Sequence, residues 1–287
     1  MKFRNIKLAT TALLLTTSLS AFDFSMSVGV HDFVVSDIIN DTPADGIHAG
    51  TSHTVGVNTA IYAKHTTTTG INILAKAEAF LDYDRDHLDP DHIPIWFDFL
   101  IDIDGIVNKF NDNHSIKWYI LMDNRQNTVS CVEREVRQHM GVGYQFTQGK
   151  FLVDLNLYGG FYYIEIDDDT PVARGYTREQ TDDGEASNIV ELTMNYDFTK
   201  HFSLKADARR YAANTGGALL EQNYELHALY KNDTILFDGV TLNFKVKYAK
   251  YDLDRFHVDN SATEGRDILP FDNDMLIQAY ATIPLNY

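Results

Sequence analysis

Residues 275–287 read MLIQAYATIPLNY, and this stretch alternates between apolar and polar side chains. One face carries an apolar series: Met275, Ile277, Ala279, Ala281, Ile283, Leu285 and Tyr287. The other face carries Gln278, Tyr280, Thr282 and Asn286. Successive side chains of a β-strand point to opposite sides, so strict alternation predicts a strand that separates two different environments.

The same alternation recurs along the chain toward its N-terminus. It predicts further strands over residues 22–31, 55–62, 71–82, 97–104, 116–122, 136–146, 151–161, 190–198, 202–208, 224–230 and 240–248. With the last segment this makes twelve, an even number, as expected of a single-chain bacterial barrel. Ten or fourteen strands remain possible from the pattern alone. The sequence therefore predicts an all-β, up-and-down antiparallel β-barrel.

The connections between these segments alternate in length. Short connections fall near 65–69, 147–150, 199–201 and 232–236, and longer polar ones near 36–51, 84–93, 167–187, 213–221 and 253–271. Short turns on the periplasmic side and long outer loops are typical of outer-membrane barrels, and this order would place both termini in the periplasm. Two connections fit less well: 105–114 is long for a periplasmic turn, and 124–128 is short for an outer loop.

A soluble β-sandwich would also show alternation. Its core needs large aliphatic side chains, because protein interiors are close-packed. Several positions on the apolar faces are small instead: Ala75, Ala77, Ala79, Ala206, Ala208 and Ala281. Small residues leave no void against fluid lipid chains, so the pattern favours a lipid-facing wall.

Together these features resemble the outer-membrane β-barrels of Gram-negative bacteria, through the pattern of strands and not through a family-specific motif. A last strand that ends in an aromatic residue, here Tyr287, resembles the signal read by the barrel-assembly machinery. The resemblance implies a bacterial outer-membrane location. It also implies contact with outer-membrane lipid and lipopolysaccharide.

The N-terminus predicts an export signal over residues 1–21. Lys2, Arg4 and Lys7 precede an apolar stretch from Leu8 to Leu15, and small residues follow up to Ala21. The apolar stretch is too short to span a bilayer as a helix. We therefore expect residues 22–287 to form the mature protein as a single barrel domain.

Composition narrows the classes of function. The formal charge of −17 repels nucleic acid, so we expect no nucleic-acid partner. The one cysteine, Cys131, excludes a framework of intrachain disulfides. A mean hydropathy of −0.25 does not separate a soluble protein from a barrel, because only alternate residues of a barrel strand face lipid.

If the apolar faces meet lipid, the polar faces line the lumen. An acidic wall is predicted from Glu78, Asp98, Asp102, Glu133, Glu135, Asp154 and Glu191. A basic wall is predicted from Lys205, Arg209, His227, Lys231, Lys245 and Lys247. Consecutive strands are neighbours in an up-and-down barrel, so the two sets should lie on opposite walls and create a transverse field.

The charged lumen predicts a porin-like channel for passive diffusion of small hydrophilic solutes. The alternative is a non-conducting structural or surface barrel that acts through acidic extracellular loops, since inward charges can also pair and fill a barrel. An outer-rim hydrolase is a more distant alternative. Its acid–base candidates are His87 with Asp84 and Asp86, His139 with Asp154, or His139 with Cys131, but no catalytic motif supports them.

One acidic run offers hard oxygen ligands for a divalent cation. Asp82, Asp84, Asp86 and Asp89 could hold Ca²⁺ or Mg²⁺ weakly, although their spacing does not match an EF-hand loop. A solvated loop is the simpler interpretation of such a charge run. We expect no other cofactor.

Overall fold

The computed structural model describes residues 22–38, 50–83, 95–126, 132–166, 182–231, 239–252 and 273–285. The predicted signal peptide and Cys131 lie outside these residues. The strands are β1 Asp23–Ile38, β2 Gly50–Thr66, β3 Asn72–Asp82, β4 Ile95–Lys109, β5 His114–Gln126, β6 Val132–Gln148, β7 Phe151–Ile166, β8 Asp182–Asp197, β9 Phe202–Ala213, β10 Leu219–Lys231, β11 Thr241–Tyr251 and β12 Asn273–Pro284.

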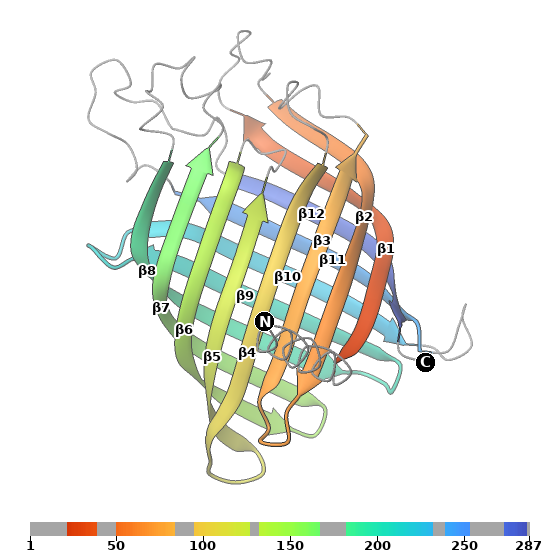
Figure 1. Ribbon diagram of the computed structural model, residues 1–287, viewed down its shortest axis with the longest axis vertical. Coiled ribbons are helices and arrows are strands. Elements are labelled where there is room, and N and C mark those ends of the chain that lie inside the picture. The colour runs from red at the N-terminus through yellow and green to blue at the C-terminus, as the bar shows by residue number, and fades with distance from the viewer. Residues whose placement is uncertain are drawn as a thin grey trace, which may run out of the picture.

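The twelve strands form a closed antiparallel barrel in which every strand pairs with its neighbours in sequence, and β1 pairs with β12 (Figure 1). The register of the closing pair runs from Ser25 opposite Pro284 to Ser36 opposite Asn273. The predicted fold class and strand number are confirmed. Within the described residues, no helix is long and apolar enough to cross a membrane.

The barrel has two different ends. We call the end at which β1 begins and β12 ends the turn end; there β2–β3, β4–β5, β6–β7 and β8–β9 are joined by short connections. The opposite end is the loop end. Gly149 has φ +59°, and this left-handed conformation allows β6 and β7 to be joined by only two residues.

The connection near 105–114 is shorter than the sequence indicated. β4 continues to Lys109 through a register shift between Ile106 and Asn108, which is typical of a β-bulge. The bulge interrupts the regular alternation of this strand, so sequence reasoning ended it too early. Only residues 110–113 lie between β4 and β5.

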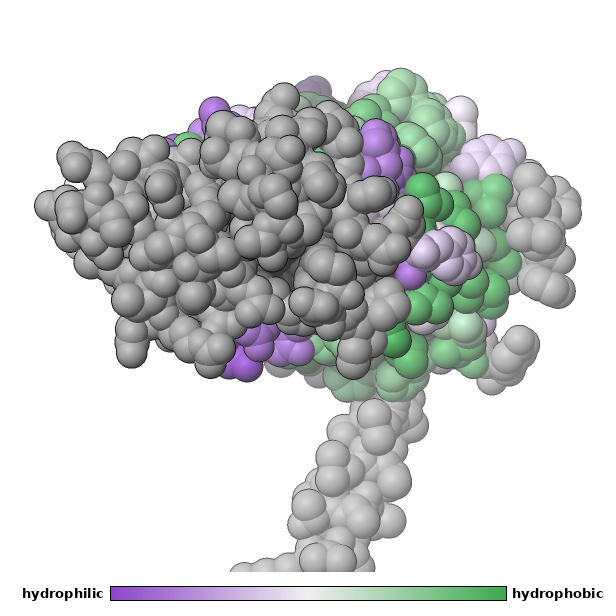
Figure 2. Space-filling model, turned by 90° about the horizontal axis from the view of Figure 1, so that it is seen from above, coloured by the Kyte–Doolittle hydropathy of each residue, from purple (hydrophilic) through white to green (hydrophobic). Residues whose placement is uncertain are grey.

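Apolar side chains cover the outer wall. Ile61, Met140 and Leu157 each expose more than half of their surface, although they lie in the middle of regular strands. Figure 2 looks down from the loop end and shows green apolar residues along the visible outer wall. Such a surface indicates an apolar surrounding in place of water.

Aromatic rings gather on the outer wall at the turn end. The ring centroids of Tyr196 and Phe198 are 4.7 Å apart, and those of Phe198 and Phe202 are 5.4 Å apart. Phe151 joins them at 6.5 Å from Tyr196. This chain of rings from β7 to β9 has the position of an aromatic girdle at a membrane–water interface.

Candidate functional site: the charged lumen

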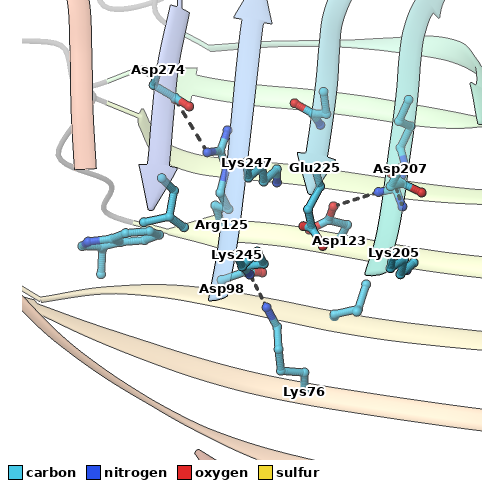
Figure 3. Close-up of a pocket in the computed structure, with 15 residues that line it drawn as sticks. Lys76, Asp98, Asp123, Arg125, Lys205, Asp207, Glu225, Lys245, Lys247 and Asp274 are labelled. Atoms are coloured by element: carbon cyan, nitrogen blue, oxygen red, sulfur yellow. Dashed lines mark hydrogen bonds and ion pairs between the residues drawn. The ribbon is translucent and has the colours of Figure 1, made fainter. Parts of the chain in front are cut away.

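A cavity of about 130 Å³ lies inside the barrel. Figure 3 shows the charged side chains that converge on it from β3, β4 and β5 and from the facing strands β9 to β12. Its charged lining is Lys76, Asp98, Asp123, Arg125, Lys205, Asp207, Arg209, Glu225, Lys245, Lys247 and Asp274. Both signs of charge therefore meet within one small space.

Arg137 on β6 has no exposed surface, like Glu135 and Glu221 beside it. Its guanidinium forms an ion pair with Glu135 on the same strand and donates to Asp123 Oδ2 on β5 at 3.3 Å. Its Nε lies 3.4 Å from Glu221 Oε2 on β10. Tyr162 donates its hydroxyl to Glu135 at 3.0 Å and to Glu221 at 3.1 Å. Arg137 is thus surrounded by carboxylates, as a buried cation requires.

Arg125 on β5 reaches the opposite side of the barrel. Its Nη2 donates to Tyr251 Oη on β11 at 2.5 Å, and its Nη1 lies 3.8 Å from Asp274 Oδ2 on β12. β5 and β11 are six positions apart in the ring of strands, which is the largest separation it allows. On its own side, Arg125 Nε donates to Glu135 Oε2 on β6 at 2.6 Å. A side-chain contact therefore spans the lumen.

Arg209 on β9 makes a second connection. Its Nη2 donates to Glu191 Oε1 on the neighbouring strand β8 at 2.5 Å, and its Nη1 donates to Asp123 Oδ2 on β5 at 3.3 Å. Tyr158 and Asn156 on β7 also donate to Glu191, at 2.6 and 3.0 Å. We call Arg125, Arg137 and Arg209, with the groups that bind them, the arginine network.

A separate group of charges lies around β3. Lys76 donates to Glu78 at 3.0 Å and to Asp98 on β4 at 2.9 Å. Glu78 also accepts from Asn58 on β2 at 3.0 Å and from Gln278 on β12 at 2.7 Å. These bonds satisfy a carboxylate that is almost fully buried.

The half of the lumen nearest the loop end also contains packed apolar side chains. The rings of Phe80 and Trp96 stack with centroids 3.6 Å apart, and Phe33 meets Trp96 edge to face at 5.7 Å. Ile164 and Ile189 belong to the same buried cluster. Sequence reasoning did not predict this cluster, because it assigned the inward face to polar residues alone.

The half nearest the turn end has a different character. A cavity of about 340 Å³ is lined by residues of β1, β2, β10, β11 and β12, among them Ser25, Tyr62, His227, Asn243 and Thr282. His227 Nε2 lies 3.0 Å from Asn243 Oδ1 and 3.3 Å from Tyr280 Oη. Charges are sparse in this lining, where Lys64 and Lys231 stand at its edge and are exposed.

The residues of the predicted basic wall divide between the two cavities. Lys205, Arg209, Lys245 and Lys247 line the charged cavity, while His227 and Lys231 line the larger one. Lys205, Lys245 and Lys247 all act electrostatically on Glu225, which stands between their strands on β10. The strands that carry this wall, β9 to β11, lie opposite β3 to β5 in the ring, whereas the predicted acidic residues extend from β3 to β8.

The residues of the predicted acidic wall are distributed more widely. Asp98 lines the charged cavity, and Glu78, Glu135 and Glu191 are bound by Lys76, Arg125 and Arg209 as described above. Half-buried Asp102 and Asp154 lie nearer the turn end, and Asp154 is bonded to Gln145. Glu133 differs from the rest: it is exposed, at a register shift between Val132 and Arg134.

Asp82 lies inside the barrel and not in a metal-binding loop. Its Oδ1 lies 2.8 Å from His31 Nε2 and accepts from Trp96 Nε1 at 3.2 Å. The other three candidate ligands, Asp84, Asp86 and Asp89, lie outside the described residues. No group of three or more potential metal ligands occurs within the part of the chain that the structure describes.

The acid–base pair suggested for His139 and Asp154 is not formed. His139 Nε2 lies 2.7 Å from Ser187 Oγ on β8, while Asp154 bonds to Gln145. Both His139 and Ser187 are buried in the loop half, away from any lipid-facing rim. Cys131 and the residues around His87 lie outside the described residues.

Sequence reasoning missed several members of the arginine network. Asp123 and Arg125 follow Met122, which is the last residue of the strand predicted over 116–122. Glu221, Tyr251 and Asp274 likewise lie just beyond the predicted strands. Each continues the inward parity of its strand by one or two steps, so extending the alternation past the last apolar residue would have found them.

No family model and no curated protein matches the sequence. Among solved structures, the KdgM porin in complex with disordered oligogalacturonate is 8% identical with a TM-score of 0.44, over 91% of this chain and 99% of that chain. An anion-selective porin from Comamonas acidovorans is 8% identical with a TM-score of 0.41, over 92% and 99%. The translocator domain of the autotransporter NalP from Neisseria meningitidis is 9% identical with a TM-score of 0.44, over 96% of each chain. The likeness concerns barrel architecture.

Proposed function

We propose that this protein is a channel of a bacterial outer membrane for passive diffusion of ions and small hydrophilic solutes. The membrane location is supported by the apolar outer wall and by the aromatic rings of β7 to β9 at the turn end. Closure of β1 on β12 satisfies the backbone groups of the strand edges, which a spanning sheet requires.

The observation that carries the channel proposal is the pair of cavities inside the barrel. The larger, of about 340 Å³, lies at the turn end and is lined by polar and apolar side chains, among them Asn243, Thr282 and Leu229. The smaller, of about 130 Å³, is lined by six cationic and five anionic side chains. Volumes of this size fit ions and small polar molecules, and the charges disfavour apolar solutes.

Charge placement supports a role in ion preference. The strands β9 to β12 contribute four cationic and three anionic side chains to the cavity, and β3 to β5 contribute two of each. The excess of positive charge therefore comes from the wall that carries Lys205, Lys245 and Lys247. Arg125 and Arg209 are engaged with carboxylates within 4 Å. Among the described residues none of the three lysines has a carboxylate that close, although Glu225, Asp207 and Glu221 attract them over longer distances. The lysines are therefore the groups we expect to act most directly on a permeating anion.

The test is single-channel recording of the refolded mature protein in a planar bilayer under a salt gradient. Replacement of Lys205, Lys245 and Lys247 by Gln should shift the reversal potential toward cation preference. Lys150→Gln is the matched control, because Lys150 lies exposed at the turn end and donates to the Phe198 carbonyl. A reversal potential that is equal in the triple variant and the control would remove the lysines from the filter.

A second function is favoured by one contact. The Arg125–Tyr251 hydrogen bond connects opposite walls, and such filling suits a non-conducting structural or surface barrel. Folding can be checked independently by heat-modifiable migration in gel electrophoresis. Absence of conductance from correctly folded protein would reject the channel and support this second function.

A further inference from the structure

Three side-chain contacts connect walls of the lumen that are not adjacent. Arg125 on β5 donates to Tyr251 on β11 at 2.5 Å, Arg137 on β6 lies 3.4 Å from Glu221 on β10, and Arg209 on β9 donates to Asp123 on β5 at 3.3 Å. In the ring of strands these pairs are six, four and four positions apart. All three contacts are made by side chains, so they can separate without any change in strand pairing.

Each arginine also has a carboxylate on its own side of the lumen. Arg125 donates to Glu135 on the adjacent strand at 2.6 Å, and Arg137 donates to the same carboxylate from the same strand at 3.0 Å. Arg209 donates to Glu191 on the adjacent strand β8. A guanidinium that separates from the far wall therefore stays paired with the carboxylate on its own side.

Each group that an arginine contacts on the far wall also has a second interaction partner. Tyr251 donates its hydroxyl to Asp274 on β12 at 2.8 Å. Glu221 is attracted by Lys247 on the adjacent strand β11, while its bond from Tyr162 on β7 also crosses the lumen and has to separate with the arginines. Asp123 accepts from Arg137 at 3.3 Å. Separation of a buried ion pair is expensive mainly because it leaves a charge without a partner. Here every group that separates keeps another interaction partner.

We propose that these cross-lumen contacts form an electrostatic gate, which passes ions when the three arginines turn back to the carboxylates on their own side. This inference rests on the proposed channel function and adds its regulation. Glu135 holds two of the arginines on the open side, because it binds both Arg125 and Arg137. Tyr251 and Glu221 hold the same two on the closed side.

The gate predicts opposite effects from two kinds of variant. Tyr251→Phe combined with Glu221→Gln removes one hydroxyl acceptor and one negative charge from the closed side. It should raise the open probability of single channels by about tenfold, the factor expected for loss of a hydrogen bond to a charged group. Glu135→Gln removes the open-side anchor and should lower the open probability. All three substitutions nearly preserve side-chain volume.

Tyr158→Phe is the matched control. Tyr158 donates to Glu191 on the adjacent strand at 2.6 Å and does not cross the lumen, so its loss should leave the open probability near that of the wild type. Heat-modifiable migration confirms that each variant is folded. If the two kinds of variant shift open probability in the same direction, or not at all, the gate is rejected while the channel stands. If every folded variant is silent, as is the wild type, both proposals are rejected.

Discussion

The two halves of the lumen are lined by different kinds of side chain. In the loop half, the rings of Tyr162 and Tyr211 lie against fully buried Arg137, and large apolar side chains such as Phe80 and Ile189 belong to the same buried cluster as these rings. In the turn half, Ser25, Thr241 and Thr282 line a cavity of about 340 Å³. The same strands pass through both halves, so the difference comes from the inward residues and not from the barrel itself.

This contrast shows that strand number alone does not determine how open a barrel is. Twelve strands leave enough interior for a passage, and large side chains can close it. Within the described residues, pairs of opposite charge and stacked rings occupy the loop half. The turn half contains the larger cavity, although some of its polar side chains, such as Lys117 and Asn243, are nearly buried.

The largest expected effect concerns solvent access. With Cys131 replaced by Ser, the variants Ser25→Cys and Ser187→Cys place one thiol in each half. Ser25 lines the turn-half cavity, whereas Ser187 has no exposed surface and is bonded to His139. If local opening costs about 3 kcal/mol, the thiol in the loop half should react with a small charged methanethiosulfonate reagent roughly 100-fold more slowly.

The measurement is the labelling rate, followed by mass spectrometry on protein in detergent micelles. Equal rates at the two positions would show that the loop half is as open as the turn half. The comparison between the halves would then fail.

The next effect concerns stability. Arg137→Met removes the cation shared by Glu135, Asp123 and Glu221, and leaving buried carboxylates without it should lower the free energy of unfolding by about 3–5 kcal/mol. Lys109→Met is the control from the turn end. Lys109 pairs with Asp112 at 3.0 Å but both side chains are largely exposed, so a loss of about 1 kcal/mol or less is expected.

Urea unfolding in lipid vesicles, followed by tryptophan fluorescence, measures both variants. Similar losses for Arg137→Met and Lys109→Met would mean that the arginine network of the loop half is no more desolvated than an exposed ion pair at the turn end.

The smallest effect tests the apolar cluster. Ile189 is inward and almost fully buried, so Ile189→Val should lower the free energy of unfolding by about 0.5–1.5 kcal/mol. Ile61→Val is the outward control, because 59% of the Ile61 surface is exposed and lipid can fill the space of a missing methylene. The same unfolding assay serves here, and an equal loss at the two positions would argue against close packing inside the barrel.

The sequence was informative about the outer wall and much less so about the lumen. Outward residues such as Phe97, Phe99 and Ile101 share one requirement, apolarity, so their alternation predicts strands directly. The identity of an inward residue depends on the partners that it contacts on distant strands. Nothing local to Arg125 indicates that it meets Tyr251, 126 positions further along the chain.

The burial of charged side chains is the second feature that the sequence alone does not predict. Phe80, Trp96 and Ile189 are apolar residues that face inward, and the alternation rule assigned their face to water. Their neighbours Glu78 and Glu191 are charged and almost fully buried. Whether an inward charge is solvated or paired depends on side chains from across the barrel, which become adjacent only once the ring has closed.

That dependence has a consequence for how the protein folds. Gln278 donates to Glu78 across 200 positions, and Arg125 reaches Asp274 on the last strand. These bonds cannot form in a partly assembled sheet, so the charges on early strands stay hydrated until β12 pairs with β1. Contacts this distant in sequence are formed slowly. Expulsion of water from the interior and closure of the seam should therefore occur together, as the last step of assembly.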